Sequence, residues 1–286
     1  TPKYIKEAAK KALDDNYTHY APTAGYPDLL EEIGKKLRKK NNIKLDDPTK
    51  QICVTAGSTE SLLLSMLCSF DPTEKVLIPN PGFATYGPTL ETVDAVPVPY
   101  YLFEDDGFEL NLDEIKKKIT PKTKGIIINS PSNPTGSVFS KSKLEELADV
   151  AIEHNLMIIS DEAYEDLVFN GKEHFSIGSL NGMEEYVLSN FTFSKSYAMA
   201  GFRIGYVVGH EKLISQMSKI HLYTSVSASS ISQRAALAAL KGSQSCVREM
   251  AREYDRRRRF ITKRINEIRG FELKKIPEGA FYIFPK

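Results

Sequence analysis

A regular alternation of short apolar segments with helical patterns constrains the fold of this 286-residue chain more than any other feature. Helical periodicity, as in residues 141–154 and 211–222, separates most of the apolar segments. The segments predicted as strands are 51–55, 76–79, 95–100, 125–129, 157–160, 187–191 and 204–208. Because these strands have almost no polar face, both of their faces must be covered. We therefore predict an α/β fold with a mostly parallel, seven-stranded sheet and helices on both faces.

The two ends of the chain indicate a second, smaller domain. The chain starts directly in an amphipathic helix, and a long charged helix at 247–268 is followed by an aromatic, β-like run. A strand with this much aromatic surface would aggregate unless further chain covered it. We expect residues 1–16 to be the N-terminal remnant of a small α+β domain and residues 17–250 to form the large domain. Residues 251–286 would begin the C-terminal small domain, truncated as in a fragment of a longer protein.

Composition argues against several classes of protein. Lys and Arg number 38 and Asp and Glu 37, so no net field favours nucleic acid or a membrane surface. The basic run 256–259 lies beside Glu249, Glu253 and Asp255, which is typical of a salt-bridged, solvated helix face. The three cysteines and five histidines are scattered without the spacing of a metal site. We expect no metal, buried thiols and a cytoplasmic protein.

Small residues follow the first predicted strand. Gly57, Ser58 and Thr59 lie between that strand and the start of a helix. Exposed N–H groups and the helix dipole make such a position a seat for phosphate or carboxylate. An ordinary helix cap by Ser58 or Thr59 explains the same residues.

Polar and aromatic residues follow further strands, where an open α/β sheet binds its ligand. Asn133, in SPSNPTG, is held in a rigid loop that would present its amide to a ligand, although a plain turn has the same composition. Phe83, in IPNPGF, is placed either over a flat cofactor or in the core.

An acid ends the strand at 157–160. Asp161 is costly to bury without a cation or donor, and it fits either a metal-binding acid of a nucleotide hydrolase or the partner of a pyridinium nitrogen. The first alternative requires a GxxxxGK[ST] segment, which is absent from the sequence. Tyr164, three residues later, would offer its phenol to the same ligand.

Lys195 lies in the segment NFTFSKSYAMAGFRIGY, with Thr192 and Ser194 beside it and Arg203 eight residues later. A lysine in this setting fits a Schiff base to a carbonyl cofactor, with the arginine on the cofactor's phosphate. A solvated surface lysine is the simpler alternative for Lys195 taken alone.

The ordered set of segments resembles the class I/II aminotransferases, which are fold-type I enzymes dependent on pyridoxal 5′-phosphate. The segments that carry the resemblance are YAPTAGYPDLLEEI, GSTES, IPNPGFATY, SNPTG, DEAYE, FSKS–AGFRIGY, SISQRAALAAL and PEGAFYIFP. They span essentially the whole chain in the family's order and are closest to archaeal-type aspartate or aromatic aminotransferases. The resemblance implies that 17–250 is the large, pyridoxal-phosphate-binding domain.

The resemblance also implies roles for single residues. Lys195 would form the Schiff base and move the proton from the substrate's Cα, and Asp161 would keep the pyridine nitrogen protonated. Tyr164 and Asn133 would hydrogen-bond the phenolic oxygen, and Phe83 would stack on the ring. The phosphate would be held by Gly57, Ser58, Thr59, Thr192, Ser194 and Arg203.

In the family, the tyrosine at the position of Tyr20 reaches the phosphate of the neighbouring subunit, which implies a homodimer with shared sites. The substrates would be an L-amino acid and a 2-oxo acid, with a side-chain pocket formed by Tyr17, Tyr86 and residues 223–230. The family's substrate-carboxylate arginine is expected beyond Lys286, and its N-terminal glycine loop before Thr1. We therefore expect this chain to bind the cofactor with poor or no turnover.

Two other functions use the same scaffold and stay open at this point. A carbon–sulfur β-lyase would release ammonia and pyruvate from a cysteine-type substrate. A non-catalytic, aminotransferase-like sensing domain would need a fused helix-turn-helix domain, and this sequence contains none.

Overall fold

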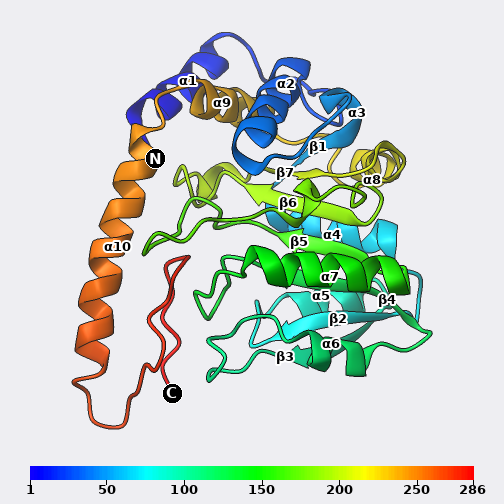
Figure 1. The fold of residues 1–286 in the computed structure, drawn as a ribbon. Helices are drawn as coiled ribbons and strands as arrows, with labels where there is room; N and C mark the ends of the chain where they lie inside the picture. Colours follow the sequence, from blue (N-terminus) through cyan, green and yellow to red (C-terminus); the bar gives the residue numbers. More distant parts are fainter.

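Seven strands form one sheet in the computed structural model, which describes residues 1–286 (Figure 1). The strands are β1 Ile52–Thr55, β2 Lys75–Asn80, β3 Val96–Tyr101, β4 Thr123–Asn129, β5 Met157–Asp161, β6 Val187–Thr192 and β7 Gly205–Val208. Their order across the sheet is β1-β7-β6-β5-β4-β2-β3. Only β7 runs antiparallel to its neighbours, so the prediction of a mostly parallel sheet is confirmed.

Helices alternate with the strands along the chain. They are α1 Lys3–Asp14, α2 Pro27–Lys36, α3 Pro48–Gln51, α4 Ser58–Ser69, α5 Tyr86–Thr92, α6 Leu112–Lys118, α7 Lys141–His154, α8 Glu211–Thr224, α9 Ser230–Lys241 and α10 Ser245–Ile265. Residues at the N-termini favour the start of several helices. Pro27 occupies the first turn of α2, and the Ser140 and Ser229 hydroxyls accept hydrogen bonds from backbone N–H groups at the starts of α7 and α9.

The central strands are buried on both faces because successive side chains point in opposite directions. Ile126 and Ile158 pack in one core with apolar residues of α7, whereas Ile127 and Ile159 pack in another with Leu62 of α4. In Figure 1, α6 and α7 lie in front of this part of the sheet, with α4 and α5 behind it. A third core joins α1, α2 and α9 to the β1, β6 and β7 side.

The last segment of the chain returns to the sheet. In Figure 1, α10 stands beside one end of the sheet, and the chain after it runs back between α10 and the strand ends. Ala280 N–H donates to Leu167 O at 2.8 Å, which ties this return to the segment after β5. The aromatic, β-like run predicted after the long charged helix is not a strand. It makes loop contacts instead, and the backbones of Glu272 and Lys286 exchange two hydrogen bonds.

None of the helices combines the length and the apolar character needed to cross a bilayer.

Candidate active site

Three strands and one turn bring polar groups together at the carboxyl edge of the sheet. Asn129 and Asp161 end β4 and β5 in register, Thr192 ends β6, and the β1–α4 turn carries Ser58. Ser58, Asp161 and Thr192 line a cavity of about 160 Å³. Its lining is Ser58, Thr59, Leu62, Phe83, Asn133, Asp161, Ala163, Tyr164, Thr192, Ser194, Lys195, Ala200, Arg203 and Tyr282. All of the residues predicted to bind the cofactor except Gly57 and Tyr20 line this one cavity.

Lys195 follows β6 and extends over an aromatic wall. Its Nζ lies 5.4 Å from the ring centre of Tyr164 and 5.3 Å from that of Phe281. Burial lowers the pKa of Lys195, the positive charge of Arg203 lowers it further, and Asp161 opposes both. The neutral amine, which is the nucleophilic form, is therefore more accessible than for a surface lysine.

Asp161 is buried at the floor of the cavity. Tyr86 Oη donates to Asp161 Oδ2 at 2.7 Å, and Ala163 N–H donates to Oδ1 at 3.2 Å. Burial raises the pKa of Asp161, whereas the Tyr86 hydrogen bond and the Lys195 charge act in the opposite direction. Asp161 lines the cavity, and each of its carboxylate oxygens accepts only one of these hydrogen bonds. It can therefore accept a further hydrogen bond from a cationic N–H group in the cavity.

The Asn133 loop is connected to the same strand ends. Asn129 Oδ1 accepts from Asn133 N–H at 2.7 Å, and Asn129 Nδ2 donates to Asp161 O at 3.0 Å. Asn129 thus links the end of β5 to the loop that carries Asn133. Sequence reasoning missed Asn129, although a polar residue at the tip of the buried strand GIIIN was a usable signal.

Tyr164 belongs to an aromatic cluster contributed by the returning chain. Its hydroxyl is 2.6 Å from that of Tyr282, and its ring meets Phe281 edge-on at 5.2 Å. Burial raises the pKa of Tyr164, and the hydrogen bond with Tyr282 adds to the effect, so its phenol stays protonated and able to donate. Tyr282 was not singled out in the sequence, because nothing local shows that the C-terminal run folds back onto β5.

The β1–α4 turn and Arg203 form a cationic corner. Arg203 Nη1 donates to Ala200 O at 3.0 Å, and Nη2 donates to Ala56 O at 3.3 Å. Gly57 has φ +90°, and a Cβ there would lie 2.5 Å from Arg203 Nη2, so only glycine fits. Neither Ser58 nor Thr59 caps α4, and their N–H groups have no partner within the helix or its cap. This corner therefore offers free donors to an anion.

Three tyrosines expected near substrate or cofactor do not line the cavity. Tyr86 is fully buried behind Asp161, so its expected place in a substrate pocket was wrong. Tyr17 packs edge-on against Tyr26, with the Arg234 guanidinium 5.1 Å from its ring centre. Tyr20 is 83% exposed on the surface.

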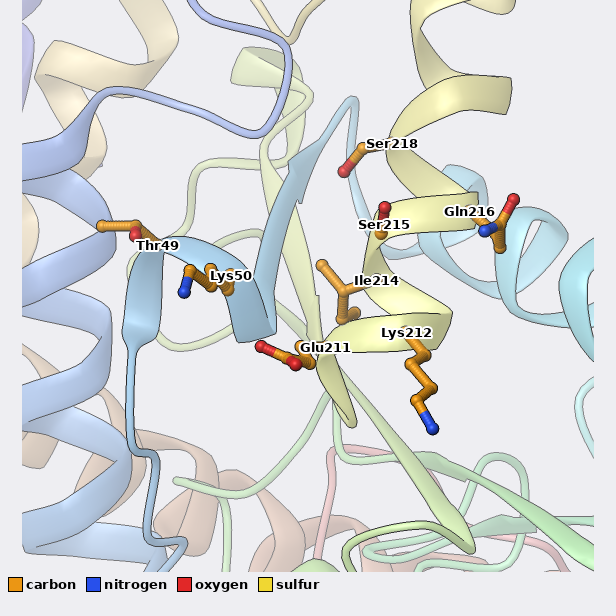
Figure 2. Close-up of a pocket in the computed structure, with 8 residues that line it drawn as sticks. All are labelled: Thr49, Lys50, Glu211, Lys212, Ile214, Ser215, Gln216 and Ser218. Atoms are coloured by element: carbon orange, nitrogen blue, oxygen red, sulfur yellow. The ribbon is translucent and has the colours of Figure 1, made fainter.

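A larger surface cleft of about 510 Å³ lies elsewhere, between α3 and α8 (Figure 2). Figure 2 shows Thr49 and Lys50 on one side and residues of α8 on the other, with the Lys212 side chain directed away from α3. The cleft contains none of the strand-end residues, and its lining is almost entirely polar. Size alone therefore does not identify the site.

Comparison with known proteins agrees with this geometry. The family model for aminotransferase class I and II matches residues 1–286. Aspartate aminotransferase of Pyrococcus abyssi is 46% identical over 288 residues, which cover 100% of this chain and 73% of the relative. Aromatic-amino-acid aminotransferase 2 of Thermococcus litoralis is 43% identical over 100% of this chain and 73% of its own length. The crystal structure of an aromatic aminotransferase from Pyrococcus horikoshii superposes with a TM-score of 0.96 at 44% identity, covering 100% of this chain and 76% of that one.

The cavity lies at the strand ends of a mostly parallel sheet and combines a lysine, a buried acid and a cationic corner. This is the arrangement of a fold-type I enzyme dependent on pyridoxal phosphate. The chain belongs to the aminotransferase class I and II family and is a pyridoxal-phosphate-dependent aminotransferase. The lyase and sensing-domain alternatives are not favoured by these relatives.

The residues present fit that cofactor. The free N–H groups of α4 and the Arg203 guanidinium suit a phosphate, and Asp161 suits a protonated ring nitrogen. Phe83 and Tyr164 supply aromatic surface, and Lys195 supplies an amine in the same cavity.

Proposed function

We propose that the protein moves an amino group from an L-amino acid to a 2-oxo acid by a ping-pong mechanism in which Lys195 is the catalytic amine. The supporting observation is that Lys195, Asp161 and Arg203 line one cavity, and that burial and the Arg203 charge lower the pKa of Lys195. A solvated surface lysine would have neither property.

The other lining residues would hold the cofactor. Arg203, with Ser58, Thr59, Thr192 and Ser194, would take the phosphate, at the N-terminus of α4 and beside Gly57. Thr192 Oγ1 donates to Ser194 Oγ at 2.9 Å, so these two hydroxyls are already oriented by one another. Asp161 would accept from the ring nitrogen, Tyr164 and Asn133 would hydrogen-bond the ring's phenolic oxygen, and Phe83 would cover one face of the ring.

When bound, pyridoxal phosphate supplies a carbonyl that condenses with amines and a conjugated ring that accepts the electron pair left at the substrate's Cα. Lys195 would act as the nucleophile, and its free Nζ would also act as the base that takes the proton from the substrate's Cα and holds it for return. Asp161, held by Tyr86, would stabilise positive charge on the ring side of the cavity. The aromatic wall of Tyr164, Phe281 and Tyr282 would exclude water near Lys195.

A second copy of the chain would complete the site. Tyr20 and Tyr223 are 83% and 86% exposed, more than any other large hydrophobic residue of the chain, which supports a shared interface. In this proposal Tyr20 reaches the phosphate of the neighbouring subunit in a cytoplasmic homodimer. We also propose the domain division 1–16, 17–250 and 251–286, in which the last boundary falls within α10.

A half-reaction tests the proposed function. The protein is loaded with pyridoxal phosphate, the visible absorbance of the lysine-bound cofactor is recorded, and L-glutamate, aspartate, phenylalanine or alanine is added without an oxo acid. Loss of the band with stoichiometric oxo acid and pyridoxamine phosphate is expected, and the rates rank the donors. Formation of the same band by Lys195→Ala would refute the role of Lys195. Ammonia and pyruvate from a cysteine-type donor, without pyridoxamine phosphate, would indicate a lyase.

A further inference from the structure

Glu60 lies in the first turn of α4, the helix whose N-terminus faces the cavity, but Glu60 is not one of the residues that line the cavity. Glu60 Oε2 accepts from Ala56 N–H at 2.6 Å. Glu60 Oε1 accepts from His221 Nδ1 at 3.1 Å and from the Ser225 hydroxyl. Three donors from two segments, the β1–α4 turn and the C-terminal end of α8, therefore converge on one largely buried carboxylate.

The His221 imidazole has no hydrogen bond other than the one to Glu60. It comes from the last turn of α8 and is completely buried, and its Nε2 has no partner. Because a carboxylate only accepts hydrogen bonds, the proton of the contact is on His221 Nδ1. Burying an imidazole costs free energy unless it is hydrogen-bonded. The only hydrogen bond of the His221 imidazole is the one that orients Glu60.

Glu60 is connected through Ala56 to the cationic corner formed by the β1–α4 turn and Arg203. The N–H of Ala56 is held by Glu60, and the carbonyl of the same residue accepts from Arg203 Nη2 at 3.3 Å. The next residue, Gly57, is in close contact with the Arg203 guanidinium and precedes the free Ser58 N–H. A shift of Ala56 would therefore move the arginine and the free N–H donors together.

The charge of Glu60 is maintained in this setting. Burial opposes ionisation, but the hydrogen bonds from His221, Ser225 and Ala56 outweigh it and lower the pKa of Glu60. An ionised carboxylate in the first turn also interacts favourably with the dipole of α4. The carboxylate is thus a strong, directed acceptor at neutral pH.

We propose that Glu60, oriented by His221 and Ser225, is a positioning residue for the cofactor's phosphate group: it fixes the Ala56–Gly57 backbone so that Arg203 and the α4 N-terminus meet the phosphate in a preorganised geometry. This inference rests on the proposed function, because it concerns the same cavity. It assigns a role to a cluster outside the cavity lining. It predicts that only the part of the binding affinity that depends on the phosphate group is reduced when Glu60 is replaced.

The test compares two ligands that differ only in the phosphate. Dissociation constants for pyridoxal phosphate and for pyridoxal are measured by absorbance titration for the wild-type protein, Glu60→Ala and Glu60→Gln. Glu60→Ala is expected to weaken pyridoxal phosphate about tenfold to a hundredfold, the effect of losing charge-assisted hydrogen bonds, and to leave pyridoxal within about twofold. Glu60→Gln keeps a neutral acceptor for Ala56 N–H and is expected to fall between the wild-type protein and Glu60→Ala in affinity for pyridoxal phosphate. Glu114→Gln, in the first turn of α6 and distant from the cavity lining, is the matched control.

His221 provides an independent variant. His221→Asn keeps a side-chain N–H donor and is expected to fall between the wild-type protein and Glu60→Ala in affinity for pyridoxal phosphate. Equal weakening of both ligands in Glu60→Ala, or no weakening of either, would overturn the inference while leaving the proposed function intact. If the wild-type protein forms no lysine-linked band with either ligand, the proposed function fails, and the inference fails with it.

Discussion

Replacing Tyr86 by Phe is expected to change the acid side of the pH–rate profile. In the structure Tyr86 Oη donates to Asp161 Oδ2 at 2.7 Å, and both groups are buried. A hydrogen bond to a charged acceptor contributes about 1.5–3 kcal/mol. Because this bond favours the ionised form, its loss raises the pKa of Asp161 and disfavours ionisation about tenfold to a hundredfold. Burial already raises that pKa, and the Ala163 N–H bond remains in the variant.

The assay is the rate of the amino-donor half-reaction measured across the acid range. A neutral Asp161 cannot stabilise a cationic ring nitrogen, so the acid limb of the Tyr86→Phe profile is expected to move to higher pH. Tyr100→Phe is the matched control, because Tyr100 is equally buried and its hydroxyl donates to Ile127 O at 3.0 Å without contacting Asp161. If the profiles of the two variants coincide, Tyr86 does not act through Asp161.

Three further variants test other parts of the structure. Arg203→Lys is expected to weaken pyridoxal phosphate about tenfold or more by absorbance titration, because a lysine cannot keep the planar contacts of the guanidinium; unchanged affinity would argue against Arg203 as the phosphate ligand. Gly57→Ala is expected to lower the free energy of unfolding by about 1–3 kcal/mol in urea, since its φ is +90° and Arg203 occupies the Cβ space; an unchanged midpoint would contradict this. Burial opposes ionisation of Glu165, but the charges of Lys36 and Lys40 lower its pKa to about 2, below the usual 4.5. Ionised Glu165 therefore stabilises the fold above about pH 4.5, and this contribution is lost as the pH falls toward 2. Glu165→Gln should show a smaller loss of stability over that range, and an identical acid loss would exclude this residue as a cause.

The positions of the site residues along the chain were predictable because local sequence patterns indicate where each strand of this fold ends. Alternating apolar strands and helices indicate a parallel sheet, and a parallel sheet places its strand ends at one edge. Asp161, Asn133 and Lys195 each follow a predicted strand, and the structure brings all three to one cavity. The predicted strands agree with the observed ones to within one residue at most ends, as in 95–100 for Val96–Tyr101.

The error about Tyr86 has a specific cause. Its neighbourhood, IPNPGFATY, shows that an aromatic residue follows β2, but not which way the ring turns as α5 begins. The first turn of α5 directs Tyr86 inward beneath Asp161, while Phe83 remains at the cavity and meets the Tyr86 ring edge-on at 5.6 Å. Side-chain direction at a loop-to-helix junction depends on packing, and periodicity does not encode it.

By itself, the sequence determined the fold class, the seven strands and the residues at their carboxyl ends, because these follow from local periodicity and composition. Only the tertiary structure decided how those residues are held. Glu60 meets His221 across 161 positions, and Tyr164 meets Tyr282 across 118. Such pairs depend on how crossovers and the returning C-terminal segment pack. Burial then turns the contacts into the shifted pKa values of Lys195 and Asp161, since desolvation exists only once the chain has closed around them.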